Sequence, residues 1–191
     1  MQKLVNLLFE VGTLRKIARS HRQRLLTEEF SDNIASHSHR VSIIGWFLAI
    51  TEKADPYKVL AMCVFHDVSE TRSGDINWVH KRYVKVFEDE IISDQLKDIK
   101  NTVQLKKLFK EYSVRKTLES RLAKDADVLD QLLLCKEYAH SGNEIAKRWI
   151  NSQEKWENRL STSIAKKLVS VILDTSPDAW AEGVSTPVRR K

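Results

Sequence analysis

Residues 55–70, DPYKVLAMCVFHDVSE, decide the fold of this chain. The stretch begins with an Asp that can cap a helix and a Pro that suits its first turn. The residues that follow are apolar on almost every side of the expected helix, and such a helix is buried on all sides. We therefore expect a helix that continues to about Glu70 and passes through the centre of a domain. His66 and Asp67 stand near its end, where burial would normally exclude them.

The composition of the whole chain favours helices over strands. Of 191 residues, 42% are hydrophobic and 30% are charged, which is typical of a soluble globular domain. Only 5 Gly and 3 Pro are present, too few for the turns of a many-stranded sandwich or barrel. We expect an all-α fold, a single helical bundle of about six to eight helices over residues 1–176. The tail, residues 177–191, is expected to be partly disordered.

Apolar residues recur with helical spacing along much of the chain. The segment at 84–112 is either one long helix or two shorter ones. Five further helices are expected at about residues 4–17, 33–52, 118–141, 144–151 and 161–173.

Cysteine use, apolar runs and charge limit the class of protein. Cys63 and Cys135 lie far apart in apolar stretches, which favours buried reduced thiols over a disulfide framework. No apolar run reaches the roughly 18 residues that span a bilayer, so we expect a cytoplasmic protein with no membrane partner. The net charge of +6 suits an anionic small-molecule substrate, although a solubilising surface explains it equally well. The basic end, residues 189–191, is too short to favour a nucleic acid partner.

Histidines and acids intrude on three apolar helices. His66 and Asp67 end the central helix, and His37 lies at the start of the helix at 33–52. An unpaired buried carboxylate is costly, and binding a cation is one way to relieve that cost. Imidazole nitrogen and carboxylate oxygen together suit Mn, Fe, Co, Zn or Ni better than Ca. Three acids interrupt the helix at 118–141: Asp125, Asp127 and Asp130.

The order of these residues, H…HD…D, resembles the HD-domain metal-dependent phosphohydrolases, an all-α superfamily. Residues 37–41, HSHRV, are similar to the family's EHSxRV block. Residues 66–75 are similar to the HDxxE…GD block of the 5'-deoxynucleotidase-like branch, and residues 124–129 to its KxADxL block. Residues 11–19 are similar to its opening GxLKxxPR segment. The blocks follow in the right order over about residues 11–142.

The resemblance implies one divalent transition metal, with Mn, Co, Fe, Ni or Zn as candidates and Mg as a further one. Its ligands would be His37, His66, Asp67 and Asp127. The KxADxL block selects Asp127 over the two neighbouring acids. Asp125 is then either a helix-terminal charge or a partner of a metal ligand, and we favour the partner. Asp130 is interpreted as a solvated or hydrogen-bonded carboxylate.

The same resemblance assigns catalytic and substrate-binding residues. Glu70 and Asp75 match carboxylates that transfer protons or orient water, and Glu70 is the first choice to activate the nucleophile or protonate the leaving oxygen. Arg19 would grip the phosphate with its guanidinium group. His39 is a candidate for substrate binding and Lys124 for electrostatic help. Trp78 follows the Gly74-Asp75 loop and is expected either to line a base pocket or simply to pack.

Two positions depart from the branch. Arg19 is followed by His21 and Arg22, where the branch has Gly and Trp, and Ser36 replaces a Glu before the first ligand. That Trp is associated with the sugar pocket, so the preference for ribose or deoxyribose stays open. Neither departure touches the expected metal ligands.

The function expected from the sequence is hydrolysis of the 5'-phosphate of a (deoxy)ribonucleoside monophosphate by a metal-dependent, 5'-nucleotidase-like enzyme. Two enzyme alternatives share the metal site: hydrolysis of another phosphorylated metabolite, or of a nucleotide diester, diphosphate or triphosphate. A third alternative is a nucleotide-sensing module without catalysis. Apolar surface left on the C-terminal helices, together with the resemblance, leads us to expect a homodimer.

Overall fold

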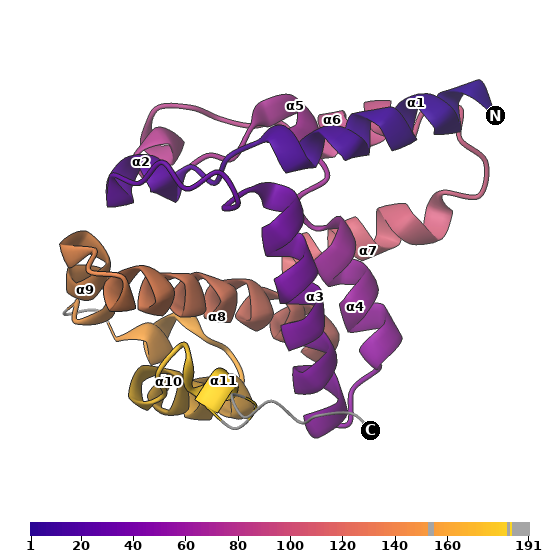
Figure 1. Ribbon diagram of the computed structural model, residues 1–191. Coiled ribbons are helices and arrows are strands. Elements are labelled where there is room, and N and C mark those ends of the chain that lie inside the picture. The colour runs from indigo at the N-terminus through magenta and orange to yellow at the C-terminus, as the bar shows by residue number, and fades with distance from the viewer. Residues whose placement is uncertain (153–154, 183, 185–191) are drawn as a thin grey trace, which may run out of the picture.

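Two adjacent helices, α3 (Ile34–Thr51) and α4 (Pro56–Phe65), form the centre of the computed structural model, which describes residues 1–152, 155–182 and 184. They run side by side, and α8 (Leu118–His140) crosses and packs against both (Figure 1). Asp55 caps α4 through its side chain, which accepts from two backbone N–H groups, and Pro56 occupies the first turn. The expected central position of this segment is therefore what the structure shows.

The remaining helices surround this centre (Figure 1). Within the described residues, eight helices contain at least seven residues and no β-strand occurs, so the all-α fold and the expected number of helices are confirmed. The other α-helices are α1 (Gln2–Val11), α2 (His21–Leu25), α5 (Glu70–Ser73), α6 (Glu88–Gln95), α7 (Val103–Val114), α9 (Glu144–Ile150), α10 (Ser163–Asp174) and α11 (Ala179–Glu182). Three short 3₁₀ helices are η1 (Gly12–Lys16), η2 (His80–Arg82) and η3 (Trp156–Arg159).

The main core lies where α3, α4, α8 and α10 meet. It is built from buried aliphatic side chains such as Leu48, Met62 and Leu129. Gly45 on α3 permits the close approach of α4, because a Cβ atom there would lie 2.6 Å from Cys63 Sγ. The tight contact between α3 and α4 brings the first turn of α3 near the end of α4.

Two expected helix ends are wrong. The central helix does not reach Glu70: α4 ends at Phe65, and residues 66–69 form a tight turn in which backbone N–H groups bond to carbonyls three residues earlier. The imidazole Nδ1 of His66 donates to the Cys63 carbonyl oxygen, so a side chain takes part in ending the helix. The first helix ends at Val11, and the expected continuation to residue 17 is the 3₁₀ helix η1.

The C-terminal part of the chain is only partly described. The short helix α11 follows the expected domain limit at residue 176. Residues 183 and 185–191, including the basic end at 189–191, lie outside the described residues. In the described part of the chain, no helix has the length and apolarity needed to cross a membrane.

Candidate metal centre and adjoining pocket

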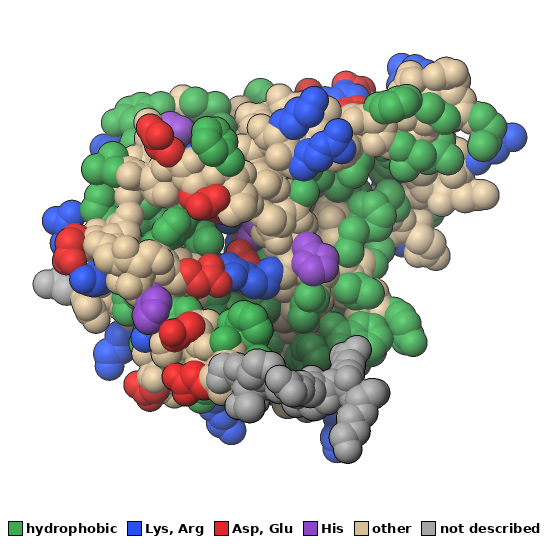
Figure 2. Space-filling model, viewed as in Figure 1, with side chains coloured by type: hydrophobic (Ala, Val, Ile, Leu, Met, Phe, Trp, Pro, Cys, Tyr) green, Lys and Arg blue, Asp and Glu red, His purple; other side chains and the backbone are tan. Residues whose placement is uncertain are grey.

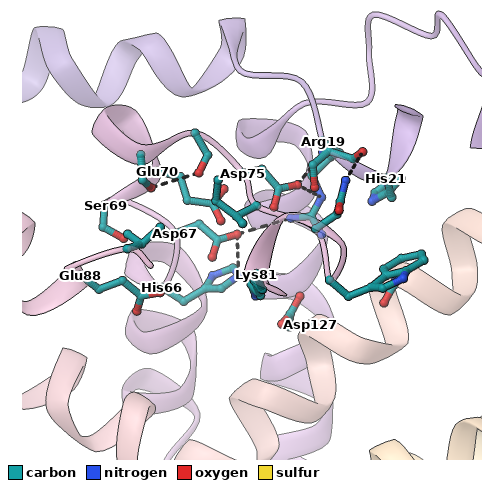
Figure 3. A pocket seen from close by; sticks show the side chains of 18 of the residues that line it. Arg19, His21, His66, Asp67, Ser69, Glu70, Asp75, Lys81, Glu88 and Asp127 are labelled. Atoms are coloured by element: carbon teal, nitrogen blue, oxygen red, sulfur yellow. Dashed lines mark hydrogen bonds and ion pairs between the residues drawn. The ribbon is translucent and has the colours of Figure 1, made fainter. Parts of the chain in front are cut away.

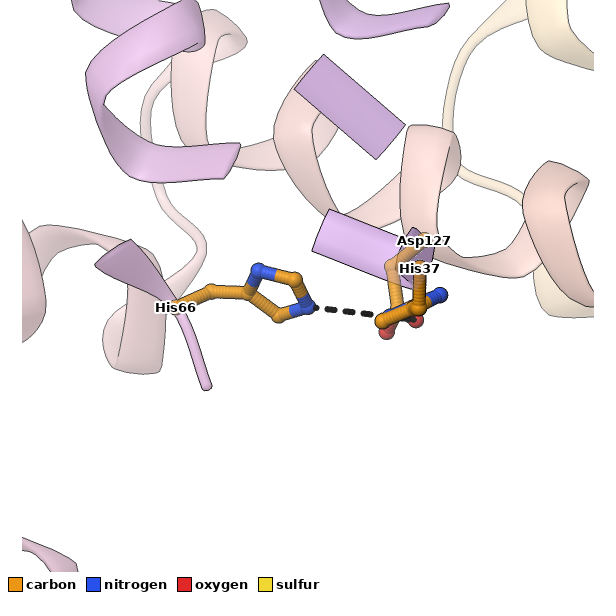
Figure 4. Close-up of side chains that lie close together, drawn as sticks. All are labelled: His37, His66 and Asp127. Carbon is orange, nitrogen blue, oxygen red and sulfur yellow. Dashed lines mark hydrogen bonds and ion pairs between the residues drawn. The ribbon is translucent and has the colours of Figure 1, made fainter. Parts of the chain in front are cut away.

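Three separate elements bring the expected metal ligands together. A capping box begins α3, in which Asn33 and Ser36 exchange side-chain to backbone hydrogen bonds, and it fixes His37 in the first turn. Ser36 therefore works as a helix cap where the branch has Glu. His66 lies at the end of α4, and Asp127 projects from the middle of α8 towards both histidines (Figure 4). One ligand atom from each of these three residues lies within 4.8 Å of the others.

Both imidazoles are oriented so that Nε2 faces the centre of this group. The Nδ1–H of His37 donates to Asp130 Oδ2 at 2.6 Å, and the Nδ1–H of His66 donates to the Cys63 carbonyl at 2.8 Å. With each Nδ1 used as a donor, the neutral ring presents a lone pair at Nε2. These two Nε2 atoms are 3.3 Å apart. Two acceptors that face each other at this distance need a positive charge between them.

The carboxylates of Asp67 and Asp127 complete the cluster. Asp67 Oδ2 lies 3.0 Å from His66 Nε2 and 3.4 Å from His37 Nε2. Asp127 Oδ1 lies 3.4 Å from His37 Nε2. Two imidazole nitrogens and two carboxylate groups, all part-buried or buried, are the donor set that a divalent transition metal prefers. The four residues therefore fit such a metal.

The charges of this cluster shift one another's pKa values. Burial and the charge of Arg19 oppose protonation of His37, but hydrogen bonds to Asp127, Asp130 and Asp67 outweigh them and raise its pKa well above the usual range. Burial alone would raise the pKa of Asp67 and of Asp127. The histidines, and Lys124 beside Asp127, hold both pKa values well below the usual range. The acids thus stay ionised and hold a proton on His37 when no metal is bound.

Asp130 orients His37, a role that the sequence analysis did not assign. Its side chain is 5% exposed and accepts from His37 Nδ1, while Arg40 Nε donates to its other oxygen at 2.5 Å. Arg40 also pairs with Glu137, which lies about two helical turns after Asp130 on α8. Such carboxylate partners fix the orientation of a ligating histidine. Helical spacing could have found it, since Asp130 lies within about 60° of Asp127 around α8.

The expectation for Asp125 is wrong. Asp125 is fully buried on the opposite side of α8, where it accepts hydrogen bonds from the backbone N–H groups of Ser161 and Thr162 and from the Thr162 hydroxyl. Thr162 is the N-cap residue of α10. Asp125 therefore ties α10 to α8, and within the described part of the chain it makes no hydrogen bond or ion pair with an expected metal ligand.

A pocket of about 620 Å³ adjoins the cluster, within the ~300–1,000 Å³ range of small-molecule sites. His66, Asp67 and Asp127 form part of its wall, and Arg19, Glu70 and Asp75 lie beside them (Figure 3). His37 does not line the pocket and lies beneath this wall. The expected metal ligands and the expected catalytic residues therefore share one site.

Arg19 is held between two of these acids. Its Nη1 lies 3.4 Å from Asp67 Oδ2, and its Nε lies 3.7 Å from Asp75 Oδ2. Asp75 Oδ2 also accepts from the Ser20 backbone N–H at 2.7 Å, which ties the loop after α5 to the segment that carries Arg19. The buried Nε of Arg19 has no hydrogen-bond acceptor within the described residues. Arg19 thus keeps a free donor beside the pocket.

Glu70 begins α5 and carries a buried oxygen, Oε2, with no hydrogen-bond partner in the described structure. Burial and the negative charges of Asp67 and Asp75 raise the pKa of Glu70 from 4.5 to about 10. A carboxyl group of this kind is protonated at neutral pH and can donate a proton.

Of the three remaining candidates, two line the pocket and one does not. Lys124 Nζ contacts Asp127 Oδ2 at 2.5 Å and lines the pocket. Trp78 also lines it, with half of its surface exposed, and its ring packs edge-on against Trp149 at a centroid distance of 5.0 Å. His39 is exposed on α3 and does not line the pocket.

The sequence analysis also missed several basic residues of the pocket wall. No motif marks them. They are Lys81, Lys85, Arg115 and Arg159.

Comparison with known proteins identifies a family and relatives. The sequence model of the HD domain family matches residues 11–169. A 5'-deoxynucleotidase from Dictyostelium discoideum is 24% identical over 161 residues, which cover 74% of this chain and 84% of the relative. A 5'-deoxynucleotidase from Erwinia tasmaniensis is 24% identical over 147 residues, which cover 68% of this chain and 73% of the relative.

Solved structures share the fold. A conserved hypothetical protein from Pyrococcus furiosus has a TM-score of 0.73 at 26% identity, with 90% of this chain and 99% of that chain covered. A predicted metal-dependent phosphohydrolase from Magnetospirillum magnetotacticum has a TM-score of 0.64 at 18% identity, with 97% and 95% covered. The second likeness is one of fold alone.

Proposed function

The chain belongs to the HD domain family of metal-dependent phosphohydrolases, and on this premise we propose that it removes the 5'-phosphate from (deoxy)ribonucleoside monophosphates. The observation that carries the proposal is the convergence of two imidazole Nε2 atoms and two carboxylates beside a pocket that also holds a free arginine donor and a protonated carboxyl group. The names of both curated relatives support the choice of substrate.

The metal ligands in this proposal are His37, His66, Asp67 and Asp127, and the metal is Mn, Co, Fe, Ni or Zn, with Mg as a further candidate. A bound divalent metal would lower the pKa of a water molecule and polarise a phosphoryl oxygen. Asp130 would keep the His37 ring turned towards the metal through its 2.6 Å hydrogen bond.

Arg19 would bind the phosphate. Its guanidinium group lies between Asp67 and Asp75, and the unpartnered Nε–H can donate to a phosphoryl oxygen. Asp75 would hold this arginine in position, since the same carboxylate oxygen accepts from the backbone beside it. Lys124 would add positive charge from the α8 side of the pocket.

Glu70 would act as the general acid. Its raised pKa leaves the carboxyl group protonated at neutral pH, so it can give a proton to the 5'-oxygen as the bond to phosphorus breaks. Trp78 would offer the base a flat surface, held by its edge-on contact with Trp149. His39 has no part in this arrangement, because it is exposed outside the pocket.

The test is phosphate release from a panel of ribo- and deoxyribonucleoside 5'-monophosphates, with Mn, Co, Mg, Ni or Zn added singly. Asp67→Asn keeps the shape of the side chain and removes one ligand charge, so its release should fall to the background rate. Exposed Asp178→Asn is the matched control and should keep the full rate. If no monophosphate is hydrolysed by protein shown to bind metal, the proposal fails, and another phosphoester or a sensing module becomes the better reading.

We also propose that the enzyme is cytoplasmic and homodimeric. The apolar surface that supports a dimer lies mainly on the N-terminal half rather than on the C-terminal helices alone: Leu8 and Phe9 of α1 are 63% and 77% exposed, and Phe47 of α3 is 60% exposed. Figure 2 shows hydrophobic side chains along α1 at the upper right. Sedimentation velocity at micromolar concentration should give a mass twice that of one chain, and a single-chain mass would contradict the proposal.

A further inference from the structure

Arg159 lies on the pocket wall in a fixed orientation that leaves its charge unpaired. Its Nη2 donates to Gln131 Oε1 at 2.8 Å, and its guanidinium carbon lies 4.6 Å from the centre of the Trp156 ring. Trp156 is only 4% exposed, so the stacking surface is rigid. An amide and an aromatic ring orient the guanidinium group, and neither carries a negative charge to neutralise it.

The orientation brings Arg159 near the metal cluster. Gln131 follows Asp127 by four residues on α8, so the two side chains share one face, with roughly 5–6 Å between their Cβ atoms. Both line the same pocket as Arg159. The guanidinium group is therefore anchored about one helical turn from a proposed metal ligand.

Three more basic residues line this pocket: Lys81, Lys85 and Arg115. Among the described residues, none of these three, nor Arg159, has a carboxylate within 4 Å of its charged group. Arg19 and Lys124 differ, since each pairs with an acid of the metal cluster. The pocket thus holds two kinds of basic residue, those that pair with the cluster and those that are free to meet a ligand.

The charge balance exceeds what a phosphate monoester can neutralise. Six basic and five acidic side chains line the pocket. A divalent metal adds two positive charges. A monoester dianion supplies only two negative charges, so a substrate with one phosphate would leave positive charge without a partner.

We propose that Arg159, together with Arg115, Lys81 and Lys85, forms a second anion subsite, and that the substrate class is nucleotides that carry a second phosphate group besides the 5'-phosphate that is removed. The inference rests on the proposed function for the transferred phosphate. The second phosphate is bound and not transferred, so it adds no step to the hydrolysis. Arg159 is the anchor of the subsite, because its orientation is fixed by Gln131 and Trp156.

The experiment compares a nucleoside 3',5'-bisphosphate with the 5'-monophosphate of the same nucleoside. In the metal-loaded wild-type enzyme, kcat/KM for the bisphosphate should be at least about tenfold higher, the size expected for a charge-assisted contact. In Arg159→Gln this advantage should disappear, so the substitution should lower kcat/KM about tenfold more for the bisphosphate than for the monophosphate. Arg148→Gln, exposed on α9 outside the pocket, is the matched control and should keep the advantage.

Two outcomes overturn the proposal. Equal kcat/KM for both substrates in the wild type would show that no second subsite exists, while the proposed function would stand. If Arg159→Gln lowers kcat/KM equally for both substrates, Arg159 binds the transferred phosphate and not a second one.

Calorimetric binding of both nucleotides to the metal-loaded protein separates this inference from a failure of the proposed function. Suppose that neither nucleotide is hydrolysed, but that the wild type binds the bisphosphate about tenfold more tightly than the monophosphate and Arg159→Gln does not. The subsite is then supported and the proposed hydrolysis is refuted. If the two nucleotides bind with equal affinity, the subsite is refuted as well.

Discussion

Replacing Asp130 by Asn changes a buried carboxylate that contacts the proposed metal site only through His37. In the wild type, one oxygen accepts from His37 Nδ1 at 2.6 Å and the other from Arg40 Nε at 2.5 Å. Asparagine has a single carbonyl oxygen, and its NH₂ group must face one of these two donors. The variant therefore removes a negative charge and sets a donor against either His37 or Arg40, which weakens the hold on the His37 ring.

The expected effect is on metal affinity. Loss of a carboxylate that orients a ligating histidine typically costs 10–100-fold in metal binding, about 1.4–2.8 kcal/mol. The four proposed ligands themselves are unchanged, so phosphate release at saturating metal should stay within about threefold of the wild type. The metal concentration that gives half of the maximal rate should rise by the same 10–100-fold as the dissociation constant.

The assay is a competition between the protein and a fluorescent metal indicator, followed by phosphate release titrated against Mn²⁺. Asp125→Asn is the matched control, because Asp125 is equally buried on the same helix but bonds to Ser161 and Thr162. We expect it to lower the melting temperature, through a loss of about 1–3 kcal/mol, and to leave metal affinity unchanged. An unchanged metal dissociation constant in Asp130→Asn, or an equal shift in both variants, would refute the reasoning.

Four further outcomes are expected. Glu70→Gln should lower kcat for phosphate release by about 10²–10⁴-fold and leave the metal dissociation constant within a few-fold of the wild type. In metal-free protein, the pKa of Glu70 is about 10 when folded and 4.5 when unfolded, so the folded state binds the extra proton between these values. The free energy of unfolding in urea should therefore decrease from pH 5 to about pH 9 more steeply in the wild type than in Glu70→Gln. Gly45→Ala places a Cβ 2.6 Å from Cys63 Sγ and 3.1 Å from Val59 Cγ1, and should cost about 1–3 kcal/mol of stability by urea denaturation. Treatment with a chelator should abolish phosphate release, and added Mn²⁺ should restore it.

For three of these predictions, a specific result would contradict the reasoning. If the free energy of unfolding changes with pH equally in the wild type and in Glu70→Gln, the folded protein does not hold this proton on Glu70. The double variant Gly45→Ala, Cys63→Ala removes the sulfur that the new methyl group meets, so it should recover part of the lost stability; no recovery would place the strain elsewhere. Full activity after chelation, with metal shown to be absent, would refute a metal-dependent reaction.

Local signals predicted most helices correctly. The apolar run after Asp55 and Pro56 and the cap at Asn33 depend on neighbours within four residues, so their effect can be read along the chain. The end of α4 could not be read in this way. Val68 follows Val64 and Phe65 at helical spacing and so favours a longer helix, whereas the bond from His66 Nδ1 to the Cys63 carbonyl helps to end it.

The tertiary contacts decided the roles of the acids on α8. Asp125 and Asp130 are both buried acids on one helix, yet Asp125 meets the start of α10 and Asp130 meets His37, which is 93 residues away in the chain. Which neighbour each acid meets depends on how α3 and α10 pack around α8. Composition and local pattern do not contain that information.

The sequence by itself determined an all-α fold with a buried central helix and the order H…HD…D, because periodicity, capping and residue type act over short distances. Only the tertiary structure decided that His37, His66 and Asp127 meet within 4.8 Å, and that Oε2 of Glu70 is buried without a hydrogen-bond partner. It also decided that Arg159 bonds to Gln131, one helical turn after Asp127 on α8. These properties depend on the packing of helices that are distant in the chain, since burial and charge proximity exist only after folding.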